Sequence, residues 1–304
     1  MKTIKFMSHR KLAMSISGLL LVISIYSLAT QQLNWGLDFT GGTLVEVHYS
    51  DSADLGAIRS TLTTSGYAGA VVVSFGSDRD VMIRLPQGYS DEQGVELMGT
   101  LQKAFGGDVE LRRMEFVGPQ VGDELREQGG LAMLLALGLV TLYIAFRFQL
   151  KFALGAIAAL VHDVILTLGF FSIIGMEFNL TVLVAILAVI GYSINDTIVV
   201  FDRIRENFRK LRRTKPEEVM NISVTETLAR TLVTSLTTLL VVTALALFGG
   251  EMIFGFAISL IVGITVGTYS SIYVASVTAL VMGVTQEDLL IPVKEGADQE
   301  DIAP

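Results

Sequence analysis

Six stretches of the chain are apolar over enough residues to cross a membrane, and a differently patterned region separates the first from the second. A helix of about 20 apolar residues spans the ~30 Å of lipid hydrocarbon. The predicted spans are Leu12–Ala29, Gly129–Phe146, Phe152–Gly175, Phe178–Phe201, Thr227–Gly250 and Met252–Val284. The last stretch exceeds one crossing, so we expect it to tilt, bend or extend past the lipid. The pattern predicts an α-helical integral membrane protein with six transmembrane helices.

Residues 30–128 show short alternating runs and two amphipathic segments instead of long apolar ones. Alternation predicts strands at Thr43–Tyr49, Ala70–Phe75, Asp80–Leu85 and Val109–Phe116, with a hairpin turn at Gly76-Ser77-Asp78. Amphipathic spacing predicts helices at Asp51–Ser65 and from a capping box at Ser90-x-x-Gln93 to Gly106-Gly107. The order β-α-β-β-α-β predicts an α+β domain of the ferredoxin-like type. It carries no catalytic or metal-ligand cluster, and we interpret His48 as an ordinary strand residue.

Composition agrees with a membrane protein. The chain is 51% hydrophobic and only 17% charged, with a mean hydropathy of +0.59, whereas a soluble domain carries about 25% charged residues. A net charge of −8 argues against nucleic-acid binding, which requires a basic patch. The absence of cysteine excludes disulfides and thiol chemistry. We expect neither a cofactor nor a metal site.

Basic residues gather before the first span and in the second–third and fourth–fifth connections. The positive-inside rule then places both termini in the cytoplasm and residues 30–128 on the periplasmic side. It makes residues 1–11 a cytoplasmic N-terminus, 202–226 a cytoplasmic basic loop and 285–304 an acidic cytoplasmic tail. The basic loop is either a topology signal or a contact for the membrane surface or a partner. The first span is expected to remain as an uncleaved anchor, since its apolar run is long for a signal peptide.

Ionisable residues inside the predicted spans are costly in lipid and therefore informative. His162 and Asp163 lie midway along the third span, Asp196 near the inner end of the fourth, and Arg230 near the inner end of the fifth. Consecutive spans run antiparallel, which puts Asp196 and Arg230 at a similar depth of roughly 5–10 Å. We therefore expect these two side chains to pair.

Further polar residues surround these positions and predict a polar face inside the bundle. The candidates are Tyr192, Ser193, Asn195, Thr234, Thr237 and Thr238. Loss of water favours a protonated carboxyl group, whereas a nearby cation favours the ionised form. An Asp196–Arg230 pair could therefore act as a proton-driven charge switch, or serve as a static salt bridge that fixes helix register. His162 either shuttles protons or orients Asp163.

Several segments match, in order, the motifs of one known family. They are Trp35–Gly42, Phe116–Gly122, Ala159–Val164, Gly191–Asn207, Leu228–Thr231, Thr234–Thr238, Phe248–Gly250 and Gly267–Tyr273. Together they resemble the SecF side of the SecD/SecF family of bacterial protein-export subunits, within the resistance-nodulation-division superfamily. The resemblance extends from the first span to the sixth.

The resemblance implies one half of a two-part transporter in the bacterial inner membrane. Paired with SecD, such a subunit uses the proton motive force, or sodium in some members, to help unfolded secreted polypeptides leave the Sec channel. It implies coupling roles for Asp196 and Arg230, with Asp163 in support. The implied partners are SecD, the SecYEG translocon, YajC, YidC, the secreted polypeptide and membrane lipid.

Three other functions fit parts of the pattern. A small-molecule or lipid exporter of the same superfamily would use the same intramembrane charges. An intramembrane aspartyl protease could use Asp163 and Asp196, but the Gly-x-Gly-Asp context of such enzymes is missing and Arg230 would hold one carboxylate charged. A purely structural subunit would tolerate neutralisation of Asp196. We expect a transport subunit and not an enzyme.

Overall fold

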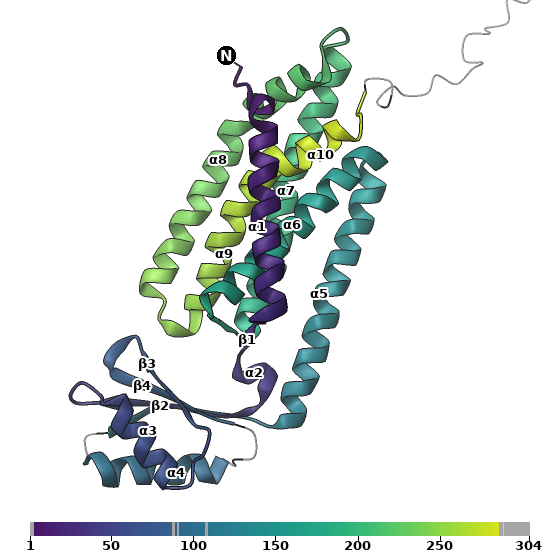
Figure 1. Ribbon diagram of the computed structural model, residues 1–304. Helices are drawn as coiled ribbons and strands as arrows, with labels where there is room; N and C mark the ends of the chain where they lie inside the picture. The colour runs from purple at the N-terminus through teal and green to yellow at the C-terminus, as the bar shows by residue number, and fades with distance from the viewer. Residues whose placement is uncertain (1–2, 87–88, 90, 107–108, 286–287, 289–304) are drawn as a thin grey trace, which may run out of the picture.

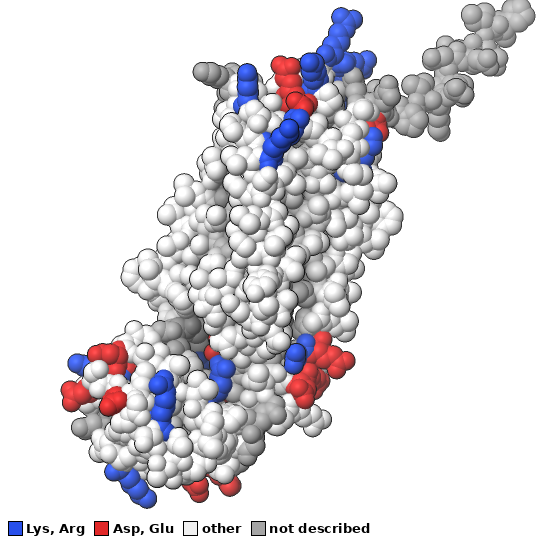
Figure 2. All heavy atoms as spheres, viewed as in Figure 1, with Lys and Arg blue, Asp and Glu red and all other residues white. Residues whose placement is uncertain are grey.

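The computed structural model describes residues 3–86, 89, 91–106, 109–285 and 288. Long helices form a bundle, and an α/β domain lies at one end of it (Figure 1). All six predicted spans are helical and apolar enough to cross a membrane. They are α1 (Arg10–Thr30), α5 (Pro119–Arg147), α6 (Leu150–Ile174), α7 (Leu180–Lys210), α8 (Pro216–Phe248), and α9 (Glu251–Ser270) continued by α10 (Ser276–Val281). On the face shown in Figure 2, charged residues lie at the two ends of the molecule and an uncharged band lies between.

The last span is not one continuous α-helix. Between α9 and α10, residues Ser271–Ala275 form a π-helical turn, labelled η2. A π-turn inserts an extra residue into the helix and shifts the side chains that follow it, and such turns are frequent at functional sites. Here the π-turn directly follows Ser270, which is fully buried.

The α/β domain has the predicted ferredoxin-like topology. Its elements are β2 (Gly42–Tyr49), α3 (Leu55–Thr64), β3 (Val71–Phe75), β4 (Ser77–Leu85), α4 (Asp91–Phe105) and β5 (Val109–Val117). The strands pair antiparallel in the order β3-β4-β2-β5. Helices α3 and α4 cover one face, where Ile58, Leu62, Leu97 and Leu101 are fully buried. The capping box predicted at Ser90 and the stop at Gly107 lie outside the described residues.

Three predicted boundaries differ from the structure. Strand β4 begins at Ser77, inside the turn predicted at Gly76-Ser77-Asp78, and Ser77 pairs with Phe75. The helix expected from Asp51 begins at Leu55, because the Asp54 carboxylate accepts hydrogen bonds from the backbone amides of Gly56 and Ala57 at 2.9 and 3.1 Å. The region expected to be a basic loop, 202–226, is mostly helical, and only residues 211–215 between α7 and α8 are not. Ion pairs of Glu206 with residues on either side stabilise the end of α7, and Pro216 is favourable at the first position of α8.

A short parallel ladder joins the α/β domain to the membrane helices, which the sequence pattern did not predict. Strand β1 (Asn34–Trp35), just after α1, pairs with β6 (Glu177–Phe178), between α6 and α7. The intervening turn α2 (Leu37–Thr40) carries Asp38, whose carboxylate accepts a hydrogen bond from the first backbone amide of α7, that of Leu180, at 2.8 Å. The chain entering the domain is therefore fixed to the start of α7.

Candidate functional site

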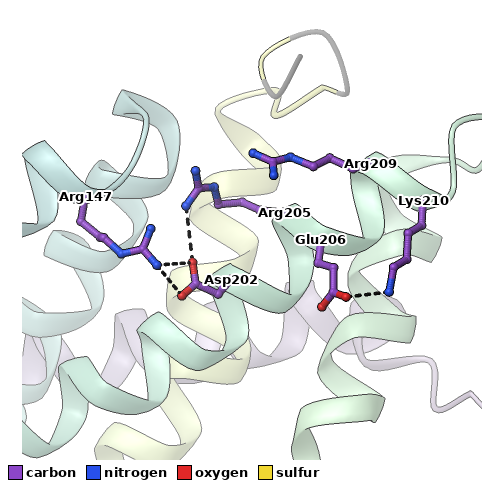
Figure 3. A pocket seen from close by; sticks show the side chains of 6 residues that line it. All are labelled: Arg147, Asp202, Arg205, Glu206, Arg209 and Lys210. Carbon is purple, nitrogen blue, oxygen red and sulfur yellow. Dashed lines mark hydrogen bonds and ion pairs between the residues drawn. The ribbon is translucent and has the colours of Figure 1, made fainter. Parts of the chain in front are cut away.

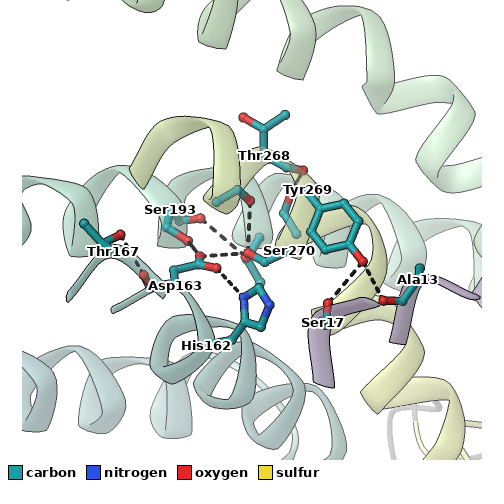
Figure 4. A network of polar contacts seen from close by, with 12 residues as sticks. Ala13, Ser17, His162, Asp163, Thr167, Ser193, Thr268, Tyr269 and Ser270 are labelled. Carbon is teal, nitrogen blue, oxygen red and sulfur yellow. Dashed lines mark hydrogen bonds and ion pairs between the residues drawn. The ribbon is translucent and has the colours of Figure 1, made fainter. Parts of the chain in front are cut away.

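Asp163 is the centre of a buried polar network (Figure 4). It lies midway along α6 and has no exposed surface. One of its carboxylate oxygens accepts hydrogen bonds from Ser193 of α7 and from Ser270 of α9, the latter at 2.7 Å. The other oxygen lies 2.9 Å from Nδ1 of His162. One carboxyl group therefore links three membrane helices at mid-depth.

Small residues bring these helices close enough for serine side chains to reach the carboxylate. A methyl group added at Gly263 would overlap Val189 of α7, and one added at Gly267 would lie 3.1 Å from Ser193. A methyl group at Gly155 of α6 would lie 2.7 Å from the carbonyl oxygen of Ala275, in the π-turn. The close-packing glycines of the sixth span thus serve contacts within this chain.

His162 extends the network toward α1. Its side chain is 2% exposed, and Nε2 has no hydrogen-bond partner among the described residues. The ring of Tyr269 lies 6.4 Å away, and its hydroxyl donates to the carbonyl oxygen of Ala13 at 2.7 Å. His162 is therefore placed to orient Asp163 through Nδ1. Its other ring nitrogen, Nε2, remains available for a hydrogen bond.

Asp196 is buried three residues beyond Ser193 on α7, but it does not form the ion pair predicted with Arg230. No such pair within 4.0 Å occurs in the described part of the chain. Ser235 of α8 and the charge of Arg230 are the groups that influence Asp196, although the Ser235 hydroxyl makes its hydrogen bond with Thr268. Ser235 is buried and Arg230 is exposed, because five residues correspond to roughly 140° around a helix. One oxygen of Asp196 has no partner among the described residues.

Of the described polar residues that support the site on α7 and α8, one contacts Asp163 and the others do not. Ser193 belongs to the Asp163 network, and the Tyr192 hydroxyl lies 3.5 Å from that of Thr238. The hydroxyls of Thr234, Thr237 and Thr238 donate to carbonyl oxygens of their own helix, and Asn195 is exposed.

Two serines of the site, Ser270 and Ser235, had no predicted role. Ser270 donates to Asp163, and Ser235 approaches Asp196 and contacts Thr268 at 2.7 Å. A signal was available for Ser270, because it lies three residues after Gly267, on the same side of the helix as the residue that permits close approach to α7.

A six-span bundle, a ferredoxin-like domain after its first helix and carboxyl groups buried among the spans together define a multi-pass membrane protein of the transporter type. Residues 97–285 match the family model described as protein export membrane protein SecD/SecF, C-terminal, and residues 26–53 match the SecD/SecF GG motif. The chain belongs to the SecD/SecF family of protein export membrane proteins.

Relatives and solved structures agree with this membership. The chain is 52% identical to protein translocase subunit SecF of Vibrio alginolyticus, over 99% of this chain and 97% of the relative. It is 54% identical to the subunit of the same name from Pseudomonas aeruginosa, over 95% of each. The crystal structure of SecDF from Thermus thermophilus superimposes with a TM-score of 0.84 at 38% identity, covering 92% of this chain and 39% of that one.

These findings confirm the predicted resemblance. They support a subunit of the Sec protein-export machinery, located in the inner membrane, and they favour that role over a small-molecule or lipid exporter.

Proposed function

We propose that this chain is one half of a SecD-paired transporter that couples a flow of protons or sodium ions to the export of unfolded polypeptides. The observation that carries the proposal is the outer face of α8. Arg230, Thr234 and Thr237 are exposed there, on a helix whose neighbouring apolar side chains are also exposed: Leu232, Val233, Leu236, Leu240 and Val241.

Contact with a second helical bundle would explain why polar side chains are exposed on this face of α8. Lipid offers no hydrogen-bonding partner, and a charge in lipid is costly, by about 2.5 kcal/mol at the bilayer centre and by less near the end of a span, where Arg230 lies. Covering Arg230 with the spans of another protein removes this cost. The solved SecDF chain is longer than this one, which covers 39% of it, and the remainder of such a chain is a natural source of the second bundle. We assign that role to SecD.

Asp196 is our candidate for the ion-binding group. It is buried on α7, it approaches Ser235 of α8, and one of its carboxylate oxygens has no partner among the described residues. A proton or sodium ion arriving at that oxygen would neutralise the carboxylate and release its attraction for Arg230. Each charge that crosses the membrane supplies about 2.3 kcal/mol per 100 mV. That energy can change the packing of α7 against α8.

The proposed orientation follows from charge. Basic residues lie at the end of the bundle opposite the α/β domain (Figure 2), so residues 1–11, 202–226 and 285–304 face the cytoplasm and residues 30–128 face the periplasm. Movement of α7 would reach the periplasmic domain through Asp38 and the β1–β6 ladder. Secreted polypeptide and the SecYEG, YajC and YidC proteins are the partners expected around it.

Export into membrane vesicles with an imposed ion gradient tests the proposal. Asp196→Asn should abolish the gradient-driven stimulation of export and leave co-purification with SecD intact. Asp123→Asn, the same substitution on an exposed turn of α5, is the matched control and should keep full activity. Full gradient-driven export by Asp196→Asn at every pH would make the carboxyl group purely structural and refute the coupling role.

A further inference from the structure

The end of the bundle opposite the α/β domain contains a cationic cavity of about 420 Å³ (Figure 3). It lies between the end of α5 and the last turns of α7. Its lining residues are Arg147, Asp202, Arg205, Glu206, Arg209 and Lys210. Four of these residues are basic and two are acidic, so the lining carries a net positive charge.

Two guanidinium groups are held beside each other in this cavity. Arg147 of α5 contacts both carboxylate oxygens of Asp202 at 2.8 and 3.1 Å, and Arg205 contacts the same carboxylate at 3.4 Å. Both guanidinium groups also lie against the ring of Phe148, at 5.2 and 5.4 Å from its centre. A single carboxylate thus serves two arginines, and their geometry is set before any ligand arrives.

Two arginines of the cavity, Arg205 and Arg209, keep hydrogen-bond donors that a ligand could use. Nε of Arg205 is buried and has no acceptor among the described residues. Arg209, one turn further along α7, makes no ion pair in the described part of the chain, because Glu206 is engaged by Lys210 and Arg203 at 2.6 and 2.9 Å. Planar guanidinium groups with free N–H donors match the oxygens of a phosphate group.

The side chains close to Arg147 in sequence are apolar and exposed. The exposed fractions of Phe146 and Leu150, which flank Arg147 closely in sequence, are 84% and 72%, and Tyr143 one turn earlier is 53% exposed. Helix α5 is also the least buried of the six spans among the described residues. A ligand that fits both features has an anionic head and apolar chains.

We propose that Arg147, Arg205 and Arg209 bind the phosphate of an anionic membrane lipid whose acyl chains lie along the end of α5. The lipid would add a connection between α5 and α7, which here already meet through the Arg147–Asp202 ion pair and through the Phe148 ring against Arg205 and Phe201. This site is independent of the ion-coupling role of Asp196. It also differs from a topology signal, which depends on the number of basic residues and not on their arrangement.

Binding of labelled phosphatidylglycerol tests the site in the complete chain, co-purified with SecD and placed in phosphatidylcholine nanodiscs. Arg209→Gln should weaken lipid binding and raise the dissociation constant about tenfold, as expected for loss of a charge-assisted hydrogen bond. Arg209 makes no ion pair among the described residues, so its replacement should leave the fold intact. Arg147→Gln is the second variant and should weaken binding similarly. Arg212→Gln, which removes the same charge from an exposed residue outside the cavity, should change binding less than twofold.

Three results would overturn the proposal. Equal weakening by Arg212→Gln and Arg209→Gln would show general attraction of the basic end and no site. Labelled phosphatidylcholine binding as tightly as phosphatidylglycerol would exclude recognition of net negative charge. Displacement of the lipid by millimolar inorganic phosphate would assign the cavity to a free phosphate compound instead. Failure of millimolar phosphate to compete supports the lipid.

Discussion

Replacing Ser270 by alanine tests how strongly its hydrogen bond to Asp163 stabilises the helix bundle, and whether the Asp163 carboxyl group is charged. The hydrogen bond is 2.7 Å long and both side chains are fully buried. A hydrogen bond to a charged group contributes about 1.5–3 kcal/mol, whereas one between neutral side chains in membrane helices averages about 0.6 kcal/mol. The oxygen that accepts from Ser270 also accepts from Ser193, and the prediction is made for an ionised carboxylate. Ser270→Ala should therefore lower the free energy of unfolding by about 1.5–3 kcal/mol.

The same substitution in an Asp163→Asn background supplies the comparison. The amide oxygen can still accept from Ser270 but carries no charge, so the cost should fall to about 0.6 kcal/mol. Unfolding is followed by circular dichroism during titration with dodecyl sulfate in mixed micelles. Thr265→Ala is the control, because its hydroxyl donates within its own helix on an exposed face, and its cost should stay below about 0.5 kcal/mol. A Ser270→Ala cost no larger than the control in both backgrounds would refute the network.

Three further perturbations test other contacts. Gly263→Ala should destabilise the bundle by about 1–3 kcal/mol because its methyl group would overlap α7, whereas Gly138→Ala, with open space around it, should not; no difference between them would refute the close packing. Asp38→Ala should cost about 0.5–2 kcal/mol and speed proteolysis between the domain and α7; unchanged proteolysis would refute the coupling. Hydrogen bonds from Ser77 and His48 hold the pKa of Asp80 below its usual 3.8, so this stabilisation exists above that pH and disappears as pH falls through the lowered value. Ser77→Ala should therefore destabilise the domain more at pH 7 than at low pH, where only the bonds that the Ser77 hydroxyl accepts from the backbone amides of Arg79 and Asp80 are still lost. Urea unfolding measures both losses, and equal losses would contradict this.

Local patterns were sufficient to predict the fold. Long apolar runs locate the six spans, since the lipid thickness sets their length, and period-two alternation locates the strands of the α/β domain. The ladder of β1 with β6 was missed, because two strands of two residues each have no periodicity to detect. The helical ends of α7 and α8 were also missed, since charge density in residues 202–226 resembles a solvated loop until the ion pairs of Glu206 are considered.

The sequence predicted which residues belong to the site, but it did not predict which residues contact one another there. The cost of burying charge in lipid identified Asp163 and Asp196, and both are buried. Depth alone could not determine which partners they have. Asp163, expected in a supporting role, holds the denser network, because Gly267 brings α9 against α7 and so brings Ser270 within reach. The side of α8 that faces Asp196 carries Ser235 rather than Arg230, and this depends on helix rotation, which depth does not reveal.

Cross-linking from the outer face of α8 tests the paired-half account most directly. The natural chain has no cysteine, so a single Thr237→Cys substitution gives one reactive site on that face. In native membranes it should cross-link to cysteines scanned through the spans of SecD, whereas Leu135→Cys, 59% exposed on α5, should not. Absence of any cross-link from Thr237→Cys, together with gradient-driven export by this chain in vesicles lacking SecD, would contradict the account.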